Sequence, residues 1–246
     1  MRLSVNVNKV ATVRNSRGGR VPSVLEAARA VVHAGAAGIT VHPRADERHI
    51  TRADTRDIAR AFAGQLGESL EYNIEGDPRP DWLDLVCEVK PQQATLVPVT
   101  PGEVTSHAGW APGEHRALLE SSIGRLRAER IRVSVFVDPD APSIRWAKEL
   151  GADRVELYTE PFARAFEQGP EAAARSFAGY VSAAELAHSL GLGINAGHDL
   201  DLDNLVLFRT LPHLDEVSIG HAIVSRAIFV GLEHVVREYL AVIAGK

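Results

Sequence analysis

The sequence predicts an α/β fold of the TIM type, a (β/α)8 barrel, formed by one domain over residues 1–246. The first observation is that short runs rich in valine and isoleucine alternate eight times with helix-patterned segments, without a compositional linker. The second is the length, because a barrel of this kind typically takes about 250 residues. The third is that no G-x-G-x-x-G follows the first strand. Its absence disfavours the alternative, an open doubly wound sheet that binds dinucleotides.

The first four strand–helix units occupy roughly the first half of the chain. Each strand is a short run of β-branched or aliphatic residues, and each helix has a helical apolar pattern. Gly35 ends the first helix, and Lys90-Pro91 ends the third, because the residue before proline avoids the helical conformation. The expected strands are 3–7, 38–42, 70–74 and 94–97, and the helices that follow them are 21–34, 53–63, 82–89 and 114–129.

The second half repeats the same unit four more times. An extended helical region follows the sixth strand, and two helices follow the eighth. The expected strands are 132–137, 154–157, 193–196 and 216–219, and the helices are 141–150, 162–190, 204–210, 223–230 and 232–244.

Composition excludes several classes of protein. The net charge of −5 gives no basic excess, so a nucleic-acid partner is not expected. No segment reaches the roughly 18 consecutive apolar residues of a membrane span, so no membrane partner is expected either. The single cysteine, Cys87, cannot form an internal disulfide and fits a reducing compartment. We therefore expect a cytoplasmic protein.

Polar side chains gather where the predicted strands end. In a barrel, the C-terminal ends of the strands and the loops after them form the active site. A carboxylate inside a strand is costly to bury without a partner, so it is rarely there for stability. These side chains are His42, Glu71, Glu75, Glu156, Asn195, His198 and His221. Several histidines and carboxylates that converge on one rim indicate acid–base catalysis.

Two segments are suited to bind anions. In Ser218-Ile219-Gly220-His221, a strand passes through glycine directly into a helix, whose first N–H groups and dipole favour a phosphate. Gly197, in Asn195-Ala196-Gly197-His198, lets the backbone approach a ligand closely. Arg17 and Arg44 can add bidentate guanidinium contacts.

A metal site is the alternative use of these histidines. Metal-dependent barrel hydrolases commonly carry an H-x-H pair on one strand, but here the second histidine is replaced, in His42-Pro43-Arg44. A guanidinium beside a divalent cation is electrostatically unfavourable. We therefore expect no metal.

Four sequence blocks, in order along the chain, carry a family resemblance. They are residues 6–18, residues 38–44 with Arg48-His49-Ile50, Asn195-Ala196-Gly197-His198, and Ile219-Gly220-His221-Ala222-Ile223. Together they resemble the pyridoxine 5′-phosphate synthases of vitamin B6 biosynthesis, from about Leu3 to Leu240.

The resemblance implies a TIM barrel with extra helices that assembles as a homo-octamer. It also implies a reaction between two phosphorylated small molecules, 1-deoxy-D-xylulose 5-phosphate and 3-amino-2-oxopropyl phosphate. The products are pyridoxine 5′-phosphate, inorganic phosphate and water, and no cofactor takes part. This chemistry needs repeated proton transfers and two anion sites, which agrees with the histidines, carboxylates and glycines described above.

The resemblance also implies roles for individual residues. His42 and Glu71 would accept protons, His198 would donate one, and Glu156 would assist a transition state. The residues that would hold the aminoketone phosphate are Asn6, Arg17, Gly197, Gly220 and His221. Those that would hold the deoxyxylulose phosphate are Arg44, His49 and Thr105.

Two positions within this site stay open. Asn8-Lys9 stands where many members of the family have Asp-His, at a position that touches the deoxyxylulose phosphate, and Lys9 can pair there with an anion. On the third strand, alternation places Glu71 and Glu75 on the same face and does not separate them. Glu75 lies nearer the C-terminal rim, whereas Glu71 matches the leucine–glutamate strand of the family, so we expect Glu71 to be the base.

Two other functions are compatible with the pattern. One is a different phosphosugar enzyme on a barrel, an isomerase or an aldolase. A Schiff-base aldolase needs a lysine at a strand end, but Lys90 and Lys148 lie near helix ends and Lys9 lies just past the first strand. The other is a barrel that binds a phosphometabolite without catalysis.

Overall fold

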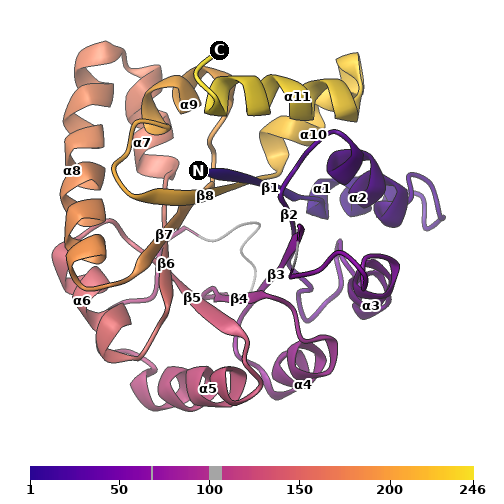
Figure 1. Cartoon of the computed structure of the whole chain (residues 1–246), viewed down its shortest axis with the longest axis horizontal. Helices are drawn as coiled ribbons and strands as arrows, with labels where there is room; N and C mark the ends of the chain where they lie inside the picture. Colours follow the sequence, from indigo (N-terminus) through magenta and orange to yellow (C-terminus); the bar gives the residue numbers. More distant parts are fainter. Residues whose placement is uncertain (68, 100–106) are drawn as a thin grey trace.

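Eight parallel strands close into a barrel in chain order in the computed structural model (Figure 1), which describes residues 1–67, 69–99 and 107–246. The first strand pairs with both the second and the eighth, with Ser4 opposite Gly38 on one side and Ser218 on the other. The strands are β1 (Arg2–Asn6), β2 (Gly38–Val41), β3 (Glu71–Gly76), β4 (Gln93–Leu96), β5 (Arg132–Val137), β6 (Arg154–Leu157), β7 (Gly193–Ala196) and β8 (Leu214–Ile219). The predicted TIM barrel is confirmed.

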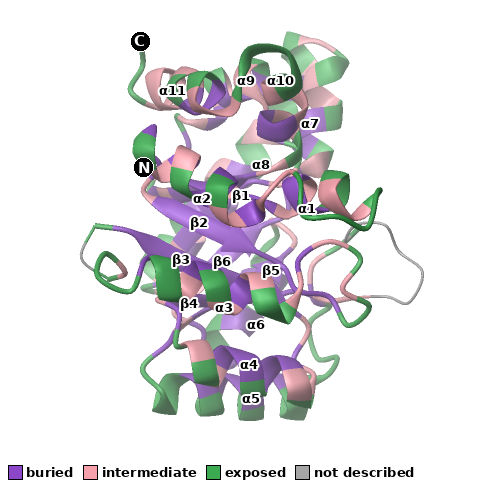
Figure 2. Cartoon of the chain, turned by 90° about the vertical axis from the view of Figure 1, so that its right-hand side faces the viewer, coloured by how far each residue is buried: buried purple, intermediate pink, exposed green. Residues whose placement is uncertain are grey.

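Helices surround the barrel on all sides (Figures 1 and 2). They are α1 (Asn8–Asn15), α2 (Val24–His33), α3 (Arg52–Ala61), α4 (Pro80–Val89), α5 (Arg116–Ala128), α6 (Ala141–Glu149), α7 (Glu160–Glu167), α8 (Pro170–Ser189), α9 (Leu202–Phe208), α10 (His221–Val230) and α11 (Leu232–Ile243). Within the described part of the chain, no helix is long and apolar enough to cross a membrane.

Two helical segments differ from the sequence prediction. Residues 8–15 form α1, although no helix is expected there, because only Val10 and Ala11 of this helix are buried and Val7 gives it no side-chain cap. The region 162–190 is not continuous but divides into α7 and α8 at Gly169, which has φ +108°. Pro170 then starts α8 at a position where its missing N–H costs nothing.

The barrel wall has one apolar and one polar face. Outward residues such as Ile39 and Ile74 are fully buried. In Figure 2 the strands are coloured largely as buried. The alternate residues carry polar groups that bond to one another, for example Ser4 Oγ to Thr40 Oγ1 at 2.7 Å. Most TIM barrels instead fill this space with branched apolar side chains. Polar groups therefore extend along the inside of this barrel from one end to the other.

Candidate active site

A cavity of about 570 Å³ lies at the C-terminal ends of the strands. This volume is within the range usual for small-molecule sites, about 300–1,000 Å³. Eleven of the residues predicted for the site line the cavity, namely Asn6, Asn8, Lys9, His42, Arg44, His49, Glu156, Gly197, His198, Gly220 and His221. Because they follow β1, β2, β6, β7 and β8, barrel closure is what brings them together.

His42 and Glu75 form a buried pair on one side of this cavity. His42 Nδ1 lies 3.7 Å from Glu75 Oε2, and Asn6 Nδ2 donates to the same oxygen at 3.4 Å. Burial, and then the cationic Arg44, hold the pKa of His42 well below its usual value. Burial, and then the charge of Glu156, raise the pKa of Glu75 well above its usual value. The imidazole of His42 is therefore held in its neutral form and can accept a proton, and the carboxyl of Glu75 keeps its proton to a higher pH than usual and can give one.

Asn8 fixes the position of His42 through the backbone. Its side-chain Oδ1 accepts a hydrogen bond from the N–H of His42 at 2.9 Å, and its own N–H donates to Asn6 Oδ1 at 3.0 Å. Lys9 follows on the same turn and lines the cavity. The Asn8-Lys9 pair, which differs from the family pattern, thus has two effects. Asn8 links the end of β1 to the end of β2 through its hydrogen bonds, and Lys9 adds a positive charge to the cavity wall.

Glu156 lies on β6, and His198 lies just after the neighbouring strand β7. Glu156 is buried, which raises its pKa to about 7, and a positive charge on His198 works in the opposite direction. The loop after β7 carries His198, whose Nδ1 is 2.9 Å from Asp199 Oδ2. The ring of Tyr158 meets the His198 ring edge to face, with centroids 5.5 Å apart. A carboxyl group that titrates near neutrality beside a histidine is suited to proton transfer.

Gly197 and Gly220 are required by packing as well as by their position in the site. A Cβ on Gly197 would lie 1.9 Å from the carbonyl oxygen of Ser218, and one on Gly220 would lie 2.8 Å from the carbonyl oxygen of Asn6. Gly220 is also the N-cap of α10, and its position provides no side-chain cap for the N–H groups of the first turn. These N–H groups and the helix dipole can receive an anion at the cavity wall.

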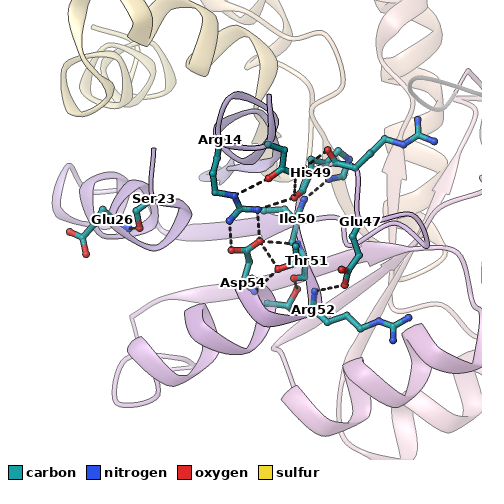
Figure 3. A network of polar contacts seen from close by, with 12 residues as sticks. Arg14, Ser23, Glu26, Glu47, His49, Ile50, Thr51, Arg52 and Asp54 are labelled. Atoms are coloured by element: carbon teal, nitrogen blue, oxygen red, sulfur yellow. Dashed lines mark hydrogen bonds and ion pairs between the residues drawn. The ribbon is translucent and has the colours of Figure 1, made fainter. Parts of the chain in front are cut away.

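A polar network holds the loop that carries His49 (Figure 3). Arg14 of α1 binds Asp54 of α3 at 2.5 and 2.9 Å and donates to the carbonyl oxygen of His49 at 3.1 Å. The backbone N–H of Ile50 donates to His49 Nδ1 at 2.9 Å. Burial, and then Arg44, lower the pKa of His49 to about 4. His49 is therefore neutral, with its hydrogen on Nε2, as a donor to a ligand rather than a charge.

Glu71 is the predicted site residue that the structure places elsewhere. It lies at the start of β3 and accepts hydrogen bonds from Arg2 and Arg132, at the starts of β1 and β5. Burial alone would raise its pKa, but these two guanidinium groups hold it below the usual value. Glu71 is thus an ionised carboxylate at the opposite end of the barrel, and the carboxylate that contacts His42 is Glu75. The geometry corrects the preference for Glu71 as the base.

Arg17 is a second predicted residue that does not line the described cavity. It is exposed in the turn after α1. Helix α1, which was not expected, lies between the first strand and Arg17 along the chain. Thr105 lies outside the described residues.

Sequence reasoning missed seven polar residues of the cavity, which are Glu160, Arg164, Glu167, Asp199, Asp201, Asn204 and Ser218. Asp199 directly follows His198, and Ser218 directly precedes the glycine-bearing strand end, so proximity to the motifs was the available signal. Glu160 and Arg164 lie on α7, which the sequence did not separate from the longer helix α8. In the described part of the chain, no group of three or more His, Cys, Asp or Glu side chains is arranged to hold a metal.

The fold and the cavity define a TIM-barrel protein with buried histidines and carboxylates at its C-terminal mouth. The chain belongs to the family of the pyridoxal phosphate biosynthesis protein PdxJ, whose sequence model matches residues 3–245. It is 51% identical to the pyridoxine 5′-phosphate synthase of Christiangramia forsetii, over 97% of this chain and 98% of the relative. It is 50% identical to that of Porphyromonas gingivalis, over 97% of both chains. The chain is therefore an enzyme of vitamin B6 biosynthesis.

Solved structures at low identity share the fold alone. The tryptophan synthase α-subunit of Pyrococcus furiosus has a TM-score of 0.63, with 12% identity over 99% of this chain and 97% of the other. Phosphoribosyl anthranilate isomerase of Thermus thermophilus has a TM-score of 0.60 with 17% identity over 100% and 99%. These matches agree with the barrel topology.

Proposed function

We propose that this enzyme condenses 1-deoxy-D-xylulose 5-phosphate with 3-amino-2-oxopropyl phosphate to give pyridoxine 5′-phosphate, phosphate and water. The observation that carries the proposal is one cavity with two proton-transfer pairs, His42 with Glu75 and Glu156 with His198. The full-length similarity to pyridoxine 5′-phosphate synthases supports the choice of substrates. No cofactor is needed, because amine addition, loss of phosphate and ring closure are proton transfers and eliminations.

The two pairs divide the acid–base work. Neutral His42 accepts a proton from the substrate, and Glu75 next to it relays the proton or keeps the ring oriented. His198 donates a proton to a leaving group. Glu156, whose pKa is about 7, stabilises the charge that develops between His198 and the leaving group.

Two anion sites flank these pairs. The start of α10, with Gly220 and His221, would hold the phosphate of the aminoketone, and later that of the product, through backbone N–H groups. Lys9, Arg44 and His49 would hold the deoxyxylulose phosphate on the other side. Fixing both substrates in one cavity would supply much of the rate through proximity.

The test is direct. Purified enzyme with both substrates is expected to release inorganic phosphate and to build the absorbance of a pyridinol product, with the product identified by mass spectrometry. Omitting either substrate is the control. The absence of product with both substrates, from protein shown to be folded, would overturn the proposal.

We also propose that the enzyme is a cytoplasmic homo-oligomer, an octamer by resemblance to its family. Apolar side chains at the end of α10 support an interface. Ile228 is 72% exposed and Phe229 is 86% exposed, and Val230 follows them. A contiguous exposed apolar patch of this kind commonly marks a contact between proteins. Analytical ultracentrifugation tests the proposal through the mass of the particle.

A further inference from the structure

The loop after β7 holds one residue in an unfavourable backbone conformation. Asp199 has φ +63°, in the left-handed region that costs free energy for residues other than glycine. Three hydrogen bonds keep the loop in place. Asn204 Nδ2 donates to the carbonyl oxygen of Asp199 at 3.1 Å, Leu200 N donates to that of Gly197 at 3.1 Å, and Thr159 Oγ1 donates to that of His198. Strain that surrounding contacts enforce is common at functional sites.

The result of this conformation is a contact between adjacent side chains. It places Asp199 Oδ2 at 2.9 Å from His198 Nδ1. The hydrogen bond from His198 is the main reason why the pKa of Asp199 lies below its usual value, so the carboxylate stays ionised and only accepts. Nδ1 must then carry a hydrogen, and the proton exchanged with substrate is carried by Nε2.

Charged and titratable groups from three other elements face the two residues. Glu156 of β6 interacts with His198 through its charge. Tyr158, directly after β6, contacts the His198 ring with its own ring. Glu160 and Arg164 of α7 and His221 of α10 act on Asp199 through their charges. Tyr158 donates its hydroxyl hydrogen to Glu160, and Glu160 also binds Arg164, so these three groups are already paired with one another. Asp199 is the carboxylate that bonds to Nδ1.

We propose that Asp199 is a positioning residue for the proton donor His198, which it holds in one tautomer and stabilises when the ring is protonated. The inference rests on the proposed function for the identity of the proton donor. A carboxylate behind a catalytic histidine serves the same purpose in other enzymes, where it fixes tautomer and orientation. Because the Asp199 side chain is 41% exposed, solvent screens part of its effect.

The experiment uses two substitutions that tolerate the left-handed backbone. D199N keeps the shape without the charge, and D199G removes the side chain and relieves the strain. The control is D203N, which removes the same charge from an exposed residue of α9 outside the cavity. We expect kcat to fall about 10- to 100-fold in D199N and D199G, with KM nearly unchanged. The alkaline limb of the pH–kcat profile should move to lower pH, whereas D203N should behave as wild type.

A second measurement does not depend on catalysis. Diethyl pyrocarbonate modifies the unprotonated imidazole, and mass spectrometry of the His198 peptide gives its rate at each pH. The pH of half-maximal modification should be lower in D199N than in wild type or D203N. An unchanged midpoint, or wild-type kcat in D199G, would overturn the role of Asp199. If wild-type enzyme forms no product, the proposed function fails instead, and the modification midpoint still decides whether Asp199 controls His198.

Discussion

Buried glutamates of the barrel fall into two groups according to the end of the strand on which they lie. Glu75 and Glu156 line the cavity at the C-terminal mouth. Glu71 and Glu216 lie at the other end, within reach of Arg2. Alternation along a strand predicts that Glu71 and Glu75 share one face and does not separate them. The position of Glu75 nearer the C-terminal rim favours it, whereas the family resemblance favours Glu71, and the structure agrees with the position.

The two glutamates of β3 should therefore respond differently to substitution. E75Q should lower kcat by about 10²- to 10⁴-fold, because the group beside His42 can no longer exchange a proton. E71Q should retain turnover but lose stability, because Arg2 and Arg132 lose the carboxylate between them. The loss should lie near the lower end of the roughly 3–5 kcal/mol seen for broken buried pairs, since Arg2 is partly exposed.

Steady-state kinetics and urea unfolding of both variants check this prediction. Each variant serves as the control of the other, since both remove one carboxylate from the same strand. A large loss of kcat in E71Q with unchanged stability would make Glu71, rather than Glu75, the catalytic glutamate of β3.

Glu156 should make the stability of the enzyme depend on pH. Its pKa is about 7 in the folded protein and 4.5 as a free side chain. The folded state therefore binds this proton more tightly, so the contribution is fully present below about pH 4.5 and is lost as the pH rises through 7. Wild-type enzyme should unfold at lower urea at pH 8 than at pH 5, and E156Q should show a smaller difference. An equal or larger difference in E156Q would contradict the assignment.

At the scale of elements, strands were easier to predict than helices. Strand β5 has the predicted bounds, 132–137, because strands buried on both faces read as continuous apolar runs. Helix α1 escaped prediction because it buries two residues and lacks a capping side chain. The division between α7 and α8 was missed although the sequence carries a signal for it, because Gly169-Pro170 is a dipeptide typical of turns and Gly169 has φ +108°.

Contacts between α1 and α3 should control substrate binding through the His49 loop. R14K keeps the charge but loses the bidentate contact with Asp54 and the bond to His49. The expected result is a several-fold higher KM for deoxyxylulose phosphate with little change in kcat, because the role proposed for His49 is to bind this substrate and not to transfer protons. R29K, in the exposed pair with Glu26 on α2, is the matched control. Equal KM values in R14K and wild type would show that the loop does not depend on Arg14.

At the scale of the molecule, closure of the barrel assembles a site from distant parts of the chain. Asn6 and His221 both line the cavity because β1 pairs with β8. Motifs at strand ends, together with the family resemblance, predicted eleven residues of this lining, since strand ends meet at one rim. The family resemblance predicted Arg17 in the site, but Arg17 is exposed in the turn after α1 and does not line the described cavity. Neither the resemblance nor the strand pattern predicted α1, the helix that precedes this turn.

Assembly is a property of the whole molecule, and a substitution at the exposed end of α10 should disrupt it. F229D places a charge on a side chain that is 86% exposed in the single chain, which costs little unless a partner covers it. We expect the variant to sediment as a smaller particle than wild type while its circular dichroism is unchanged. L118D is the control, because Leu118 is also exposed but lies on α5, across the barrel from α10 (Figure 1). A monomeric wild-type enzyme, or identical masses for wild type and F229D, would remove this patch as an interface.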